Sequence, residues 1–182
     1  MSCPAPRKRL ELKESSLYAE PLTLRYIREN FDYTNAVIVS PDAGGAKRAT
    51  MLADRLDLNF ALIHKERARP NEVSRMTLVG DVQGKIAILV DDMADTCGTL
   101  CKAADVLVEN RAKEVVAIVT HGILSGDACE KVSNSKLGRL VVTDTVPHAE
   151  KKKKCPKIHT IEVAPTVRQQ SGGLWVGGEG EC

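Results

Sequence analysis

The chain has 182 residues, of which 43% are hydrophobic and 27% charged, as is typical of a soluble globular protein with one sizeable core. A formal net charge of +2 and an aromatic content of 3% argue against a nucleic-acid or membrane partner. No apolar run approaches the roughly 18 residues that a membrane span needs, and segment 1–9 lacks the apolar core of a signal peptide. We therefore expect a cytoplasmic location.

Short apolar runs rich in β-branched residues alternate with helical apolar stripes along most of the chain. A first helix is predicted to start near Pro21, a residue suited to a first helical turn. After it, the pattern predicts strand 36–39, helix 46–56, strands 60–63, 76–79 and 86–90, helix 100–108, and strands 115–119 and 140–142. This order predicts an α/β fold with a single doubly wound, mostly parallel sheet and helices on both faces.

The domain is expected to span residues 17–163. Segment 1–16 is polar and the tail 164–182 is rich in glycine, so both are expected to be flexible. The run Lys151–Lys154 is expected to be a solvated loop rather than a nucleic-acid or localisation signal.

The most informative stretch begins where strand 86–90 meets two adjacent acids, followed by a short loop and helix 100–108. Such a loop offers backbone N–H groups and the positive end of a helix dipole, which together bind a phosphate. The paired acids would repel a phosphate but suit the vicinal hydroxyls of a sugar or a hydrated Mg²⁺. A phosphate at one end and diol acceptors at the other describe ribose 5-phosphate. The residues expected to bind it are Asp91, Asp92, Asp95, Thr96, Cys97, Gly98 and Thr99.

A purely structural alternative is that Thr99 caps the helix and the acids fill a turn. The whole arrangement, however, resembles the loop that binds 5-phosphoribosyl 1-pyrophosphate (PRPP) in type I phosphoribosyltransferases and ribose-phosphate pyrophosphokinases. Segments elsewhere look like the pyrophosphokinase family, and the resemblance runs from about residue 17 to 163. These segments are 40–48, 64–67, 79–82, 90–96 and 120–125.

The resemblance implies a phosphoribosyltransferase-like fold and a transferase of the kinase type. The family moves the diphosphoryl group of ATP to the anomeric hydroxyl of ribose 5-phosphate, using Mg²⁺, and gives PRPP and AMP for nucleotide biosynthesis. It also implies that Asp42 is a Mg²⁺ ligand, and that Lys65 and Arg67 are catalytic cations on a loop that closes over the phosphates. A structural alternative for Asp42 is that it caps a helix, and segment 64–72, taken by itself, reads as a solvated loop. His121, at a strand end, is expected to be structural.

The resemblance covers only the second of the family's two similar domains, and the tail from residue 164 departs from it. The first domain normally supplies much of the ATP site, so we expect a truncated chain that is impaired alone, and either a homo-oligomer or an associate of full-length subunits. Two alternatives stay open. One is a non-catalytic regulatory subunit associated with the enzyme. The other is a type I phosphoribosyltransferase, although the chain shows no hood for a nucleobase.

Overall fold

The structure is a computed structural model that describes residues 20–69 and 72–163, with side chains described outside 66–75. Its helices are α1 (Glu20–Asn30), the 3₁₀-helix η1 (Tyr33–Asn35), α2 (Ala46–Leu56), α3 (Gly98–Glu109), α4 (Ala128–Asn134) and α5 (Ala149–Lys154). Its strands are β1 (Ala36–Ser40), β2 (Asn59–Arg69), β3 (Glu72–Val79), β4 (Ile86–Ala94), β5 (Glu114–Gly122), β6 (Arg139–Thr143) and β7 (Ile158–Ile161).

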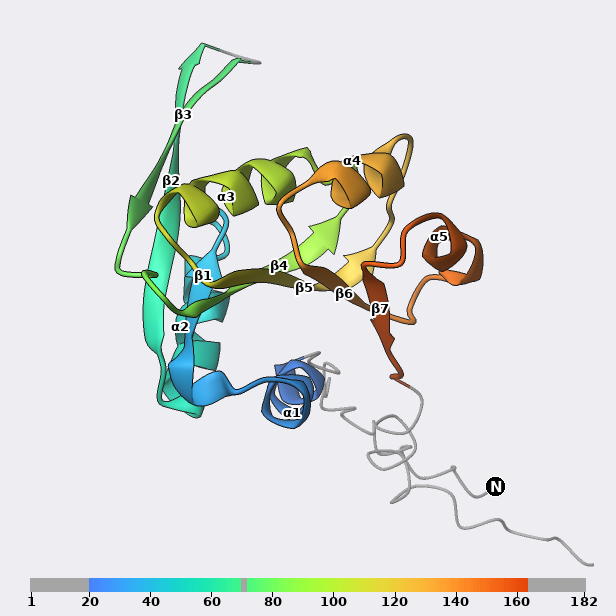
Figure 1. Ribbon diagram of the computed structural model, residues 1–182, viewed down its shortest axis with the longest axis horizontal. Helices are drawn as coiled ribbons and strands as arrows, with labels where there is room; N and C mark the ends of the chain where they lie inside the picture. Colours follow the sequence, from blue (N-terminus) through green and yellow to red (C-terminus); the bar gives the residue numbers. More distant parts are fainter. Residues whose placement is uncertain (1–19, 70–71, 164–182) are drawn as a thin grey trace, which may run out of the picture.

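The strands form one sheet in the order β3-β2-β1-β4-β5-β6-β7, in which all neighbours are parallel except β2 and β3. Helices α3 and α4 cover one face and helices α1 and α2 cover the other (Figure 1). The fold prediction, a doubly wound and mostly parallel sheet, is confirmed. In the described part of the chain, no helix is both long enough and apolar enough to cross a bilayer.

Each face of the sheet carries its own apolar core, because alternate residues of the central strands point to opposite sides. Val37 and Leu89 pack on the side of α3 and α4, whereas Ile38 and Ile88 pack on the side of α1 and α2; all four are fully buried. Since these strands are covered on both faces, they are continuous apolar runs rather than alternating ones. This is why the sequence pattern located them well.

Two predictions about charged segments were wrong. The described residues of the expected loop 64–72 lie in β2 and β3, which pair antiparallel from Leu62 to Arg69 of β2. The segment has no apolar pattern that would predict a strand, but backbone hydrogen bonds between β2 and β3 form the strands there. The expected loop Lys151–Lys154 lies in helix α5, which buries none of its side chains; lysine is a good helix former even where no apolar face is covered.

Three further elements differ from the expectation. Strand β4 continues past the acids to Ala94 because β5 runs alongside as far as Gly122. Helix α4 and strand β7 were not predicted, since both are short. The expected flexible segments, 1–16 and 164–182, lie outside the described residues.

Candidate functional site

The sheet has one topological switch point, between β1 and β4. From β1 the chain moves outward through β2 to β3, and it then returns to place β4 on the other side of β1. Adjacent connections therefore leave the sheet toward opposite faces, which opens a crevice at the carboxyl ends of β1 and β4. The loop with Asp42 follows β1, the acids lie within β4 near its carboxyl end, and the expected phosphate loop follows β4. The sequence-predicted residues thus converge where such folds bind ligands.

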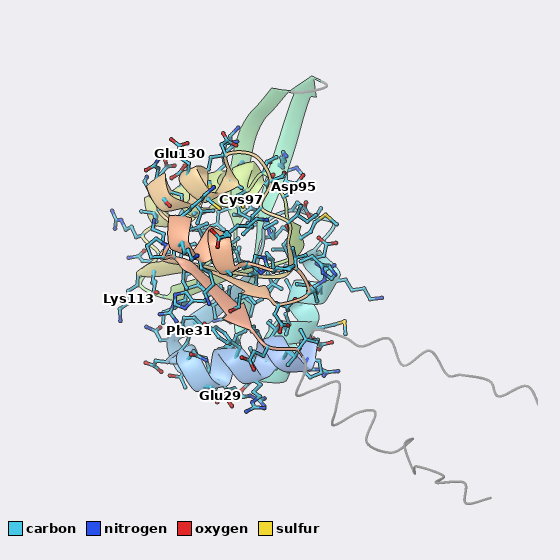
Figure 2. All side chains as sticks on the ribbon, turned by 90° about the vertical axis from the view of Figure 1, so that its right-hand side faces the viewer. Glu29, Phe31, Asp95, Cys97, Lys113 and Glu130 are labelled. Atoms are coloured by element: carbon cyan, nitrogen blue, oxygen red, sulfur yellow. The ribbon has the colours of Figure 1, made fainter. Side chains whose placement is uncertain are left out.

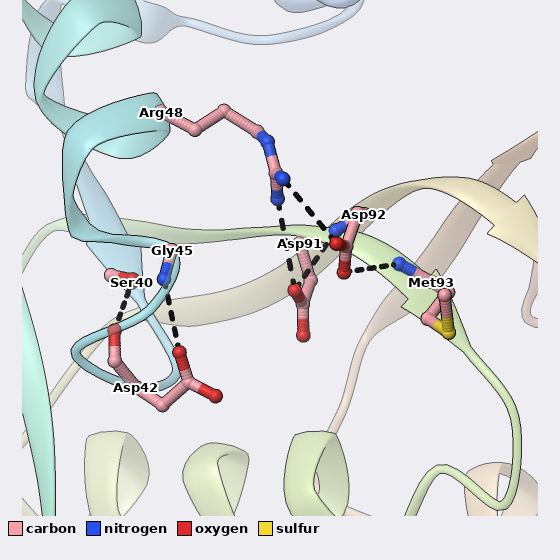
Figure 3. A network of polar contacts seen from close by, with 7 residues as sticks. All are labelled: Ser40, Asp42, Gly45, Arg48, Asp91, Asp92 and Met93. Carbon is pink, nitrogen blue, oxygen red and sulfur yellow. Dashed lines mark hydrogen bonds and ion pairs between the residues drawn. The ribbon is translucent and has the colours of Figure 1, made fainter.

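The loop after β1 is held tightly in place by local hydrogen bonds. Asp42 Oδ1 accepts from the Gly45 backbone N–H at 3.0 Å, and Ser40 Oγ donates to the Asp42 carbonyl at 2.6 Å (Figure 3). A Cβ on Gly45 would lie 2.8 Å from Ser40 Oγ, so only glycine fits here. One carboxylate oxygen of Asp42 thus orders the loop ahead of α2, but Asp42 does not cap the helix, whose N-cap is Gly45 without a side-chain cap.

Asp91 and Asp92 face a cation that the sequence analysis did not single out. Arg48, on the first turn of α2, places Nη1 3.8 Å from Asp91 Oδ1 and Nη2 3.4 Å from Asp92 Oδ2 (Figure 3). The carboxylates are also tied to the strand, since Asp91 Oδ1 accepts from the Asp92 amide and Asp92 Oδ1 from the Met93 amide, each at 2.9 Å. The sequence signal for Arg48 itself was its place at the end of segment 40–48, which belongs to the resemblance.

The two carboxyl groups have different electrostatic environments. Burial raises the pKa of Asp91 to about 6; the hydrogen bond from the Asp92 amide opposes this rise, whereas the Asp92 side chain and the charge of Asp42 add to it. Desolvation also acts to raise the pKa of Asp92, but the hydrogen bond with Asp91 and the charge of Arg48 outweigh it and leave that pKa below its usual value. Asp91 thus lies within electrostatic reach of both Asp42 and Asp92, while Arg48 pairs with Asp91 and Asp92.

This excess of carboxylates fits a hydrated divalent cation. Protonation of Asp91 is favoured by burial and by neighbouring negative charge, so a bound cation would relieve the same repulsion. No group of three or more close metal ligands occurs among the described residues. Mg²⁺ is commonly held by one or two carboxylates, with waters and substrate phosphates filling its other positions, so a complete protein cage is not required.

The loop between β4 and α3 presents backbone to the crevice. Cys97 precedes α3 in the left-handed conformation, with φ 58°, and gives the helix no side-chain cap. The first N–H groups of α3 therefore remain available to another acceptor. Asp95 and Thr96 are exposed, while Gly98 and Thr99 are half-buried at the start of the helix.

The Cys97 side chain does not face a ligand. It is buried in the core beneath α3, and burial raises the pKa of its thiol to about 12, so it stays protonated at neutral pH. Of the predicted loop residues, Cys97 can therefore contribute only its backbone. Figure 2 shows Asp95 and Cys97 on the side of the molecule from which the β2–β3 hairpin projects, with Glu29 of α1 at the opposite end.

The predicted cations lie on that hairpin. Ser40, at the end of β1, pairs with Leu62, so β2 continues beyond the level at which β1 ends and projects past the carboxyl edge of the sheet (Figure 1). Lys65, three residues further, stands about 10 Å beyond that level at 3.3 Å per residue, and it is half-buried. Arg67 lies in the same strand, next to a register shift, and its side chain is outside the described part.

A cavity of about 690 Å³ lies beside the carboxylates, between α1, α2 and the ends of β4 and β5. Gly44, Arg48 and Asp91 are among the residues that line it, and Lys47 and Arg55 add two further cations. His121, by contrast, is exposed and forms a hydrogen bond of 3.0 Å between Nδ1 and Thr145 Oγ1. That bond joins the end of β5 to the segment that follows β6, in keeping with the structural role expected for His121.

The comparisons with known proteins agree with the resemblance found in the sequence. Residues 67–170 match the family described as "Phosphoribosyl synthetase-associated domain". The chain is 68% identical over 154 residues to "Ribose-phosphate pyrophosphokinase 3" of Saccharomyces cerevisiae, an alignment that covers 85% of this chain and 48% of that protein. It is 66% identical over 151 residues to "Ribose-phosphate pyrophosphokinase 2" of Schizosaccharomyces pombe, covering 82% and 47%. The chain therefore spans about half the length of the curated relatives it matches.

The fold also matches a crystal structure of phosphoribosylpyrophosphate synthetase from Mycobacterium smegmatis. The TM-score is 0.75 at 36% identity, over 86% of this chain and 50% of that one. The family match covers more than half of the 182 residues, and the expected resemblance is confirmed. The chain belongs to the phosphoribosyl synthetase-associated domain family, and it is similar to about half the length of the ribose-phosphate pyrophosphokinases that it matches.

Proposed function

We propose that the crevice between β1 and β4 binds ribose 5-phosphate and PRPP, and that the chain serves the transfer of a diphosphoryl group from ATP to ribose 5-phosphate. The reaction breaks the bond between the α- and β-phosphates of ATP. It forms a bond from the anomeric oxygen to the β-phosphorus, and it releases AMP and a proton.

The 5-phosphate is assigned to the loop Asp95–Thr99. The backbone N–H groups at the start of α3 and the Thr99 hydroxyl would donate hydrogen bonds to it, aided by the positive end of the helix dipole. Asp91 and Asp92 lie one short loop away, where their carboxylates would accept hydrogen bonds from the ribose diol. Arg48 holds both carboxylates in place through its ion pairs.

The ATP side is assigned to Asp42, Lys65 and Arg67. When bound, Mg²⁺ would neutralise charge on the transferring phosphates, and Asp42 would be its carboxylate ligand from this chain. The two cations stand on a hairpin that projects over the same edge of the sheet. They would offset the negative charge that develops on the transferring phosphates. The hairpin of β2 and β3 as a whole would close over the transferring phosphates.

The observation that carries the proposal is the convergence at one switch point of a carboxylate cluster and an uncapped helix start. Neither feature is explained by stability. The αL conformation of Cys97 and the elevated pKa of Asp91 both cost folding free energy. Costly groups of this kind concentrate at functional sites.

The assignment of the phosphate loop is tested by calorimetry on the 182-residue chain. Wild type is expected to bind ribose 5-phosphate and not ribose, because the phosphate contacts supply most of the affinity. Thr99→Val keeps the side-chain volume and removes the hydroxyl, so binding should weaken by roughly 1–3 kcal/mol. Equal affinities for the two proteins would refute the role of Thr99.

The role of Lys65 is tested separately, by following AMP release from ATP in the presence of Mg²⁺. Any transfer by this chain is expected to require ribose 5-phosphate and to be lost in Lys65→Ala. Lys113, a distant lysine that follows α3, gives a matched control in Lys113→Ala. AMP release that persists in Lys65→Ala would show that Lys65 has no part in the reaction.

A further inference from the structure

The connection from β5 to α4 forms hydrogen bonds with the start of the loop that leads to Thr99. The Leu124 amide donates to the Ala94 carbonyl at 2.9 Å, and the Ser125 amide donates to the Asp95 carbonyl at 3.1 Å. Ser125 Oγ donates a third hydrogen bond, to Asp95 Oδ1. Asp95 is otherwise exposed, so these contacts from residues 124–125 fix where the phosphate loop begins.

The supporting connection itself is not a relaxed turn. Leu124 has φ 50°, in the left-handed region that a branched side chain rarely adopts. Such a conformation persists only where the surroundings hold it. The question is therefore which residues hold segment 122–125.

Two side chains at and just before α5 form hydrogen bonds with consecutive backbone carbonyls of this segment. His148 Nε2 lies 2.7 Å from the Gly122 carbonyl oxygen, and Lys151 Nζ donates to the carbonyl of Ile123. Because a carbonyl only accepts, His148 must carry its proton on Nε2. His148 is 4% exposed, and a Cβ on Gly122 would stand 2.7 Å from its Nε2, so the ring and the backbone fit closely.

The spacing of the two donors follows from the helix. His148 is the residue before α5, and its own carbonyl accepts from the Lys152 amide at 2.9 Å. Lys151 follows one turn later on the same face. Helix α5 buries none of its own side chains, so its contact with segment 122–125 is made by these two polar groups rather than by a packed apolar face.

We infer that His148 and Lys151 are positioning residues for the phosphate site: they clamp segment 122–125, which in turn fixes Asp95 and the start of the phosphate loop. This inference rests on the proposed function for its consequence on ligand binding. The clamp itself is a statement about the protein alone. It also gives one lysine of the run Lys151–Lys154 a defined role.

The test compares four variants of the 182-residue chain. His148→Leu removes the donor and keeps an apolar side chain, while His148→Gln restores an N–H near the position of Nε2. Lys151→Met removes the ammonium group and keeps the length of the side chain. Lys154→Met is the matched control, because Lys154 is an exposed lysine of the same helix.

Two measurements are made on each variant. Amide hydrogen exchange at Leu124 and Ser125 reports whether segment 122–125 still holds Asp95, with the core amides of β1 as the reference for global unfolding. Calorimetry with ribose 5-phosphate reports the consequence for the ligand. In His148→Leu and Lys151→Met, exchange at these two amides should accelerate by about tenfold or more relative to the β1 amides. The dissociation constant should rise about 2- to 30-fold, the range for residues coupled to a site through intermediate contacts.

His148→Gln and Lys154→Met should resemble wild type in both measurements. A purely structural role for His148 would accelerate exchange in the core together with Leu124 and Ser125, and this would contradict the clamp. If His148→Leu fails to fold, Lys151→Met decides. Faster exchange at Leu124 and Ser125 with unchanged ligand affinity would overturn the inference. If wild type does not bind ribose 5-phosphate, the proposed function has failed, and the exchange data alone decide whether the clamp exists.

Discussion

Replacing Asp91 with Asn should make the protein more stable at neutral pH. The folded protein raises the pKa of Asp91 from 3.8 to about 6, chiefly through burial and then through Asp92 and Asp42. A folded-state pKa above the unfolded value means that the folded state holds the proton more tightly. The free energy of unfolding therefore falls as pH rises from about 4 through about 6, and the loss is complete above that window.

The size of the effect follows from the pKa difference. A rise of about two pKa units in Asp91 lowers the free energy of unfolding by about 3 kcal/mol at neutral pH. The lowered pKa of Asp92 raises that free energy again in part, so the net loss from the pair is about 1–2 kcal/mol. Asn cannot titrate, yet its side-chain oxygen can still accept from the Asp92 amide as Asp91 Oδ1 does. Relative to wild type, Asp91→Asn should thus gain about 1–2 kcal/mol near pH 7.5, and the gain should vanish near pH 4.

Urea denaturation of both proteins across this pH range measures the difference. Asp92→Asn is the matched control: its side chain is 55% exposed and its pKa is lowered, so neutralising it should bring no gain at any pH in the range. An Asp91→Asn variant that is no more stable than wild type at pH 7.5, or whose advantage does not change with pH, would refute the reasoning. A carboxylate kept at a cost to stability is what a binding site requires.

Two other substitutions test how the site is held. Arg48→Met removes the cation that faces both carboxylates, so the pKa of Asp92 should rise, which a carboxyl ¹³C NMR titration would show; an unchanged titration would mean that the ion pairs have no effect in solution. Gly45→Ala places a methyl group 2.8 Å from Ser40 Oγ and should cost about 1–3 kcal/mol of stability by overpacking. Thermal unfolding measures that loss. The matched control is Gly98→Ala, because its new Cβ would lie 4.0 Å from the nearest neighbouring atom. Gly84→Ala is a poorer control, because Gly84 has φ 71° and an alanine there would strain the backbone.

The apolar pattern predicted the parts of the fold that are buried on both sides. Strands β1, β4 and β5 are continuous runs of branched residues, and α2 was predicted with the bounds that the structure has, from the spacing of Ala49, Leu52 and Leu56. The apolar pattern failed to predict the segments whose structure does not depend on burial of side chains. The hairpin of β2 and β3 is held by backbone pairing, and the helix at Lys151–Lys154 has no apolar face.

The site was predictable only in its local parts. The acids near the end of β4 and the loop Asp95–Thr99 that follows it form a continuous motif. Arg48, by contrast, is 43 residues before Asp91 in the sequence, and Ser125 is 30 residues after Asp95. Their contacts depend on strand order, which places β1 next to β4 and β4 next to β5. A single sequence carries no direct signal for such pairs.

The central claim is that ribose 5-phosphate binds in the crevice between β1 and β4 with its phosphate on the start of α3. The most direct test is titration of the ¹⁵N-labelled chain with ribose 5-phosphate, followed by amide NMR, with ribose as the matched control. We predict saturable shifts that are largest at Asp95–Thr99, extend to Asp91 and Asp92, and are absent with ribose. No shift at these amides, or larger shifts elsewhere in the described chain, would contradict the account.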